Sequence, residues 1–180
     1  MDTKQPFILL DQIDSLDLWG RIYSELDFHP NVKESPLTIN QRNYAYDISE
    51  LTEENIQMLD EYLPEIFARC LGLNEYMIAM DTQKNEFLYN PRIKLEKKIM
   101  LVNDSQNGAH NVYFPDFYPD SGDYCFFVDK DLKWGYVGHP WLQKIWVFGS
   151  SLLYEIDKIK NDIGFTKYKK KRMTLWDLLR

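Results

Sequence analysis

The sequence predicts an α+β fold in which a curved antiparallel β-sheet carries about three helices, packed mainly on one of its faces. Two observations support this prediction. Phe, Trp and Tyr make up 15% of the 180 residues, and aromatic residues favour strands. Apolar segments of strand length also follow one another at short intervals in the second half of the chain. Short connections favour antiparallel pairing, because parallel neighbours need crossovers of about a dozen residues or more.

Three segments have the apolar spacing of amphipathic helices. Leu18, Ile22 and Leu26 recur at every fourth position, which places them on one helix face. The middle segment opens with a threonine and two glutamates, a pattern typical of a capped N-terminus. We expect the helices to dock their apolar faces on the sheet. The predicted helices span residues 15–26 with Ser15 as N-cap, 52–72 with Thr52 as N-cap, and 150–163 with Ser150 or Ser151 as N-cap.

The other apolar segments predict strands. They are rich in β-branched and aromatic residues, and Asn107-Gly108 marks a tight turn between two of them. The predicted strands span residues 43–48, 76–81, 86–89, 98–102, 111–114, 124–128, 135–138 and 144–148.

The chain length fits one globular domain, which we place at residues 1–164. Residues 165–180 form a basic and aromatic tail that is too short to be stable alone. Within this tail, every residue from Lys167 to Arg172 except Tyr168 is basic. We expect the tail to dock on the domain or on a partner, and the sequence leaves that choice open.

The charge of the chain narrows the class of partner. The net charge is −7 at pH 7 and the isoelectric point is about 5.0, which disfavours nucleic acid and suits a basic protein. The apolar run Phe7–Leu10 is too short for a signal peptide or a membrane span, so we expect a cytoplasmic protein with no membrane partner. Cys70 and Cys125 lack metal-binding spacing and are expected to be reduced thiols.

The block from Pro119 to Gly149 gathers glycines, aromatic residues and a histidine. Glycine permits close backbone approach, and Trp and Tyr combine a large apolar area with a polar tip. Such a block is typical of an aromatic-packed hairpin or of a binding site. Its candidate residues for binding a ligand or partner are Tyr124, Trp134, Tyr136, His139 and Trp141.

His139 is the catalytic candidate of this block. As a general base it would need a carboxylate or nucleophile within hydrogen-bond reach, and Asp123 and Asp131 are the conceivable partners. The alternative, which we favour, is that His139 bonds to backbone at a turn while Trp141 packs beneath it.

No metal site and no cofactor is predicted. Aspartates cluster between residues 116 and 131, but their spacing differs from that of an EF-hand calcium loop. The three histidines are scattered along the chain. The usual serine-hydrolase, zinc-protease, phosphate-binding and dinucleotide-binding motifs do not occur.

Four motifs and two weaker echoes carry a family resemblance. The motifs are Gly122-Asp123-Tyr124, Asp131-Leu132, Gly138-His139-Pro140-Trp141 and Phe148-Gly149; the echoes are Trp19 with Phe28-His29-Pro30, and Met80-Asp81 leading to Phe87-Leu88-Tyr89-Asn90-Pro91. On these residues the chain resembles an uncharacterised bacterial family, domain of unknown function 2716, over most of residues 16–160. It departs from the family pattern at Thr82 and Leu142, where that pattern has a tryptophan and an acidic residue. The resemblance implies no activity.

Three functional hypotheses follow. The leading one is a small cytoplasmic protein that binds a basic protein partner, in one form an immunity protein that neutralises a toxin. The second is a hydrolase or transferase that uses His139 with Asp123 or Asp131 beside an aromatic pocket. The third is a structural homo-oligomer, joined through a sheet edge or the tail.

Overall fold

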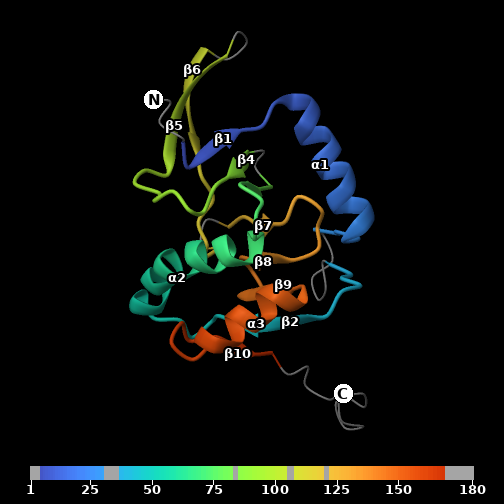
Figure 1. The fold of residues 1–180 in the computed structure, drawn as a ribbon, viewed down its shortest axis with the longest axis vertical. Helices are drawn as coiled ribbons and strands as arrows, with labels where there is room; N and C mark the ends of the chain where they lie inside the picture. Colours follow the sequence, from blue (N-terminus) through green and yellow to red (C-terminus); the bar gives the residue numbers. More distant parts are fainter. Residues whose placement is uncertain (1–4, 31–36, 83–84, 105–107, 120–121, 169–180) are drawn as a thin grey trace, which may run out of the picture.

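The computed structural model describes residues 5–30, 37–82, 85–104, 108–119 and 122–168. Among these residues, an eight-stranded sheet forms the centre of the molecule and a two-stranded hairpin projects at one end (Figure 1). The sheet is antiparallel throughout and helices cover it, so the expected α+β fold is confirmed.

The glycine-rich and aromatic block of the sequence forms the middle of the sheet. Its strands β7, β8 and β9 are consecutive neighbours in the order β1-β4-β3-β7-β8-β9-β2-β10. The strands are β1 (Phe7–Leu9), β2 (Asn43–Asp47), β3 (Met77–Asp81), β4 (Glu86–Tyr89), β7 (Cys125–Val128), β8 (Gly135–His139), β9 (Lys144–Phe148) and β10 (Thr166–Lys167). The block is thus first of all a packed antiparallel meander.

The three helices cover both faces of this sheet. They are α1 (Gln12–Glu25), α2 (Glu53–Leu71) and α3 (Ser150–Ile159). Figure 1 shows α1 apart from α2 and α3, which lie together. The core residues agree, because Leu63 and Ile156 share one apolar cluster and Ile22 belongs to the other. Two helices therefore lie on one face and α1 lies on the opposite face.

The central strands are apolar at nearly every position because both of their faces are covered. Phe126 of β7 packs in the cluster on the α1 side, whereas the next residue, Phe127, packs in the cluster on the α2 side. Successive side chains of a strand point to opposite faces, and a strand buried on both faces reads as a continuous apolar run.

The hairpin consists of β5 (Ile99–Asp104) and β6 (Gly108–Tyr113), with Ile99 opposite Tyr113. Gly108 has a φ of 68°, a conformation that glycine adopts at little cost. This fits the turn predicted at Asn107-Gly108, although Asn107 itself lies outside the described residues.

Two predicted helix starts are wrong. The first helix begins before Ser15, because Asp11 caps it by accepting a hydrogen bond from the Asp14 backbone N–H at 2.9 Å. The last helix has Gly149 at its N-cap, without a side-chain cap, and ends at Ile159. The N-cap at Thr52 and the C-cap at Gly72 are as predicted, and the structure adds a capping box in which the Asn55 side chain accepts from the Thr52 backbone N–H.

The start of the predicted tail packs on the domain. Phe165 is buried in the core on the α2 side, and β10 pairs with β2 through Thr166 opposite Asp47. The Tyr168 backbone N–H donates to the Ala45 carbonyl at 2.8 Å. The rest of the basic run and Trp176 lie outside the described residues.

Candidate functional site

His139 ends strand β8 and is 2% exposed. Its Nδ1 accepts a hydrogen bond from the Leu142 backbone N–H at 3.3 Å, so the proton of the neutral ring is on Nε2. Nε2 then donates to the Tyr124 hydroxyl, 3.0 Å away, and this hydroxyl donates to the Pro30 carbonyl at 3.2 Å. This relay ties the turn after β8 to the segment that follows α1.

The environment of His139 keeps the ring neutral. Burial, with a smaller contribution from the positive charge of Lys144, lowers the pKa of His139 from 6.5 to about 4. Burial also raises the pKa of the Tyr124 hydroxyl to about 12. Among the described residues, the hydrogen-bond partners of the ring are Tyr124 and Leu142, neither of which is a carboxylate. This is the geometry of a structural histidine at a turn.

Asp123 and Asp131 lie at opposite ends of the β7–β8 pair. Asp123 precedes β7 near His139, where its carboxylate accepts the Tyr124 backbone N–H at 2.8 Å. Asp131 lies in the turn between β7 and β8, at the end of this pair where β8 begins. Lys133 donates to its carboxylate at 2.7 Å, and this hydrogen bond is the main reason that the pKa of Asp131 is lowered. The structure therefore brings only Asp123 near the His139 end.

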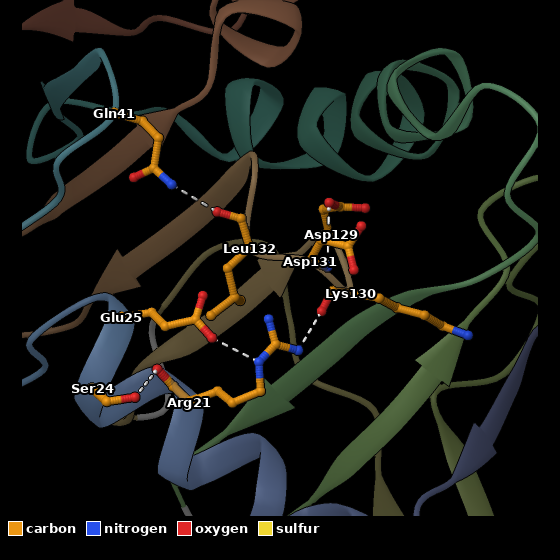
Figure 2. Close-up of polar contacts among 8 residues, drawn as sticks. All are labelled: Arg21, Ser24, Glu25, Gln41, Asp129, Lys130, Asp131 and Leu132. Carbon is orange, nitrogen blue, oxygen red and sulfur yellow. Dashed lines mark hydrogen bonds and ion pairs between the residues drawn. The ribbon is translucent and has the colours of Figure 1, made fainter.

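Figure 2 shows the polar contacts that hold the turn containing Asp131 in place. Arg21 of α1 donates to the Lys130 carbonyl at 2.6 Å and to Glu25 at 2.8 Å. Gln41 donates to the Leu132 carbonyl at 3.0 Å. Helix α1 and the segment before β2 thus hold the backbone of this turn in place.

Trp134 and Tyr136 face away from His139, into the core on the α2 side. The Trp134 ring stacks on Phe67 at 6.0 Å between centroids, and the Tyr136 hydroxyl donates to the Phe117 carbonyl at 2.8 Å. Both residues are buried. Of the five predicted binding residues, the structure gathers Tyr124, His139 and Trp141 and places these two elsewhere.

An aromatic groove lies on the α1 side at the His139 end of the sheet. It has a volume of about 480 Å³. Trp141 forms one part of its wall; this side chain is 67% exposed and meets the Tyr124 ring edge-on at 5.9 Å. The groove is lined by Ser15, Leu16, Trp19, Tyr23, Phe28, Pro30, Thr82, Glu86, Tyr124 and Trp141.

Of the groove-lining residues, the sequence predicted only Tyr124 and Trp141 as site residues, and the charged residue that it missed is Glu86. It is only 4% exposed, and the Trp19 indole Nε1–H donates to its Oε1 at 2.6 Å. In the sequence it is one charged residue at the start of a strand, with nothing local to indicate burial. The partial signal was the motif echo that joins Trp19 with Phe28-His29-Pro30, because Trp19, Phe28 and Pro30 all line the groove.

Neither a metal centre nor a membrane span is found in the part of the chain that the structure describes. No group of three or more His, Cys, Asp or Glu side chains there could hold a metal ion. None of the helices within the described ranges has the length and apolarity to cross a membrane.

Comparisons with known proteins agree with the resemblance of the motifs. The family model "Protein of unknown function (DUF2716)" matches residues 9–153, a range that includes all of the residues lining the groove. The uncharacterized protein YxiI of Bacillus subtilis (strain 168) is 33% identical over 100 residues, 55% of this chain and 54% of YxiI. The chain thus matches about half the length of this curated relative. No solved structure matches.

Proposed function

We propose, for a chain that belongs to the DUF2716 family of proteins of unknown function, a role as a binding protein that holds a basic protein partner at the aromatic groove. The carrying observation is the groove itself, which is open, aromatic and preformed. The side chains that dominate protein–protein binding are mostly aromatic or arginine residues that fill well-packed, desolvated pockets.

The rim of the groove suits a protein contact. Trp141 and Leu16 are each 67% exposed and Tyr23 is 50% exposed, so large apolar surfaces meet water side by side. Exposed apolar patches mark interaction sites, and Trp and Tyr are enriched among residues that dominate binding once they are desolvated. A partner that buries these three side chains therefore gains more binding free energy from apolar burial than a partner that contacts other parts of the rim.

The charge near the groove suits a basic partner. Glu86 is a carboxylate that lines the groove, and the whole chain has a net charge of −7 at pH 7. Opposite charges on two surfaces accelerate encounter and exclude partners of the wrong sign. Neutralisation of a basic toxin in the cytoplasm is the specific form of this role that we propose.

The hydrolase or transferase hypothesis has less support. A general base near neutral pH needs a pKa close to the working pH and access to the substrate proton. His139 is buried, its pKa is lowered to about 4, and both of its ring nitrogens have hydrogen-bond partners. Its relay to Tyr124 and Pro30 supports the groove wall instead.

The test is affinity capture from lysate of the native cells, with the wild type and two variants as baits. Trp141→Ala removes the exposed groove ring, and Tyr113→Ala removes an exposed ring of the hairpin as a matched control. We expect one basic protein, identified by mass spectrometry, to be retained by the wild type and Tyr113→Ala, lost with Trp141→Ala and released by salt. Equal retention by all three baits contradicts the proposal.

A further inference from the structure

Glu86 is a buried carboxylate inside the aromatic groove. Within the described part of the chain, its side chain has one hydrogen-bond donor, the Trp19 indole, which occupies Oε1. An ionised carboxylate has about four lone-pair positions on its two oxygens. Oε2 thus has acceptor capacity that the described residues do not use.

Some other carboxylates of the molecule have cationic partners. Glu155 accepts from Arg69 and Lys158, and Asp116 accepts from Lys98. No described lysine or arginine forms an ion pair with Glu86, although Glu86 is only 4% exposed. A cationic group that enters the groove would give this carboxylate the kind of partner that buried charges usually have.

The walls around this carboxylate also favour a cation. The ring of Trp19 lies 5.7 Å from that of Tyr23 and 6.5 Å from that of Phe28, with interplanar angles of 35° and 32°. These three rings therefore form one continuous aromatic wall. Aromatic faces carry the negative part of the ring quadrupole, and they attract ammonium and guanidinium groups within about 6 Å.

We propose that the groove binds a cationic side chain of the partner, with Glu86 as its counter-charge and Trp19 as its main aromatic contact. This rests on the proposed function and names the chemistry that the groove recognises. One occupied and one available carboxylate oxygen suit a lysine ammonium, which is a point charge, better than the bidentate fork of an arginine.

The test uses a lysine side chain without a partner. N-acetyl-L-lysine methylamide is titrated into ¹⁵N-labelled protein while the Trp19 indole N–H resonance is followed, assigned with the Trp19→Phe variant. N-acetyl-L-norleucine methylamide is the neutral control of similar shape. We expect a saturable shift with the lysine probe, and binding of the norleucine probe weaker by about tenfold. Equal binding of both probes overturns the inference.

Two variants measure the contribution of the Glu86 charge to binding of the lysine probe. Glu86→Gln keeps an oxygen that accepts from Trp19 but removes the negative charge. Glu50→Gln is the control, because it removes one exposed negative charge from a residue that does not line the groove. We expect Glu86→Gln to weaken lysine binding about tenfold and Glu50→Gln to leave it unchanged, with both variants melting as cooperatively as the wild type. Unchanged binding in Glu86→Gln overturns the inference.

A third probe separates a side chain from a free small cation. If choline binds the groove more than about tenfold more tightly than the lysine probe, the site is built for a quaternary ammonium and the side-chain assignment is wrong. Partner capture separates this inference from the proposed function. If Glu86→Gln retains the partner while Trp141→Ala loses it, the groove still binds the partner and only the cation inference fails.

Discussion

The polar residues that the sequence singles out lie near the two ends of strand β8, and the packing around these two ends differs. At the Asp131 end, Arg21 and Gln41 donate to turn carbonyls and fasten the turn. At the His139 end, aromatic side chains leave a groove of about 480 Å³ with a buried carboxylate inside. A cluster of charged residues in a sequence thus indicates a turn as readily as a functional site. The His139 end, where the groove lies, is the better functional candidate.

The largest expected effect on stability comes from removing a ring between the groove and the core. Phe28 is buried and meets Tyr124 and Phe126 edge-on, each at 5.1 Å between centroids. We expect Phe28→Ala to lower the free energy of unfolding by about 3–5 kcal/mol, because it removes packed ring area and leaves a cavity. Urea denaturation measures this value. A loss below about 1 kcal/mol would mean that the groove wall is not fixed by core packing.

The second effect depends on pH. Because the pKa of His139 is lowered from 6.5 to about 4 on folding, the unfolded chain binds the proton more readily between these values. The contribution of the neutral ring is therefore complete above pH 6.5 and is lost as the pH falls towards 4. It amounts to at most about 3 kcal/mol, since one pKa unit corresponds to about 1.4 kcal/mol.

Comparison with a variant that cannot titrate isolates this effect. His139→Gln keeps a donor and an acceptor on the side chain. Urea denaturation at pH 7 and pH 4.5 should show a steeper loss of stability in the wild type than in His139→Gln. Identical pH dependence of the two proteins would show that the ring is not held neutral, and the structural role assigned to His139 would be wrong.

A smaller effect is expected for Tyr124→Phe. The change removes the hydroxyl that accepts from His139 and donates to Pro30, so the buried His139 ring and the Pro30 carbonyl each lose a hydrogen-bond partner. We expect a loss of about 1–3 kcal/mol in the free energy of unfolding, measured by urea denaturation. A neutral result would mean that water replaces the hydroxyl and that the relay does not hold the groove segment.

The smallest effect is expected at the turn end. Arg21 is partly exposed, and its contacts to Lys130 and Glu25 compete with water. We expect Arg21→Gln to cost about 0.5–1 kcal/mol in thermal or urea unfolding and to leave partner capture unchanged. If this variant loses the partner while Trp141→Ala retains it, the functional roles of the two ends are reversed.

The sequence predicts elements whose signals are local. The N-cap at Thr52 and the strand at residues 124–128 follow from neighbouring residues, and both are found in the structure. The start of α1 was misplaced because Asp11 and Ser15 are both acceptable caps in a sequence. Strand β1 was missed because its three residues gain stability only by pairing with β4, about eighty positions away.

The candidate site was predictable only in part for the same reason. Tyr124, His139 and Trp141 come from one block of the sequence, and the structure places them together. Trp19 and Glu86 are 67 positions apart, and only the crossing of α1 over the sheet brings them into contact. Trp134 and Tyr136 illustrate the opposite error, since strand alternation and the core on the α2 side decide which aromatic residues are available to bind.

The most direct test of whether the partner binds at the His139 end is hydrogen–deuterium exchange, measured on the captured complex and on the free protein. The groove account predicts slower exchange on binding in residues 14–30 and 139–143, with unchanged exchange in the turn at residues 129–134. Protection confined to that turn, or to the hairpin at residues 99–113, with the groove segments unchanged, would contradict it.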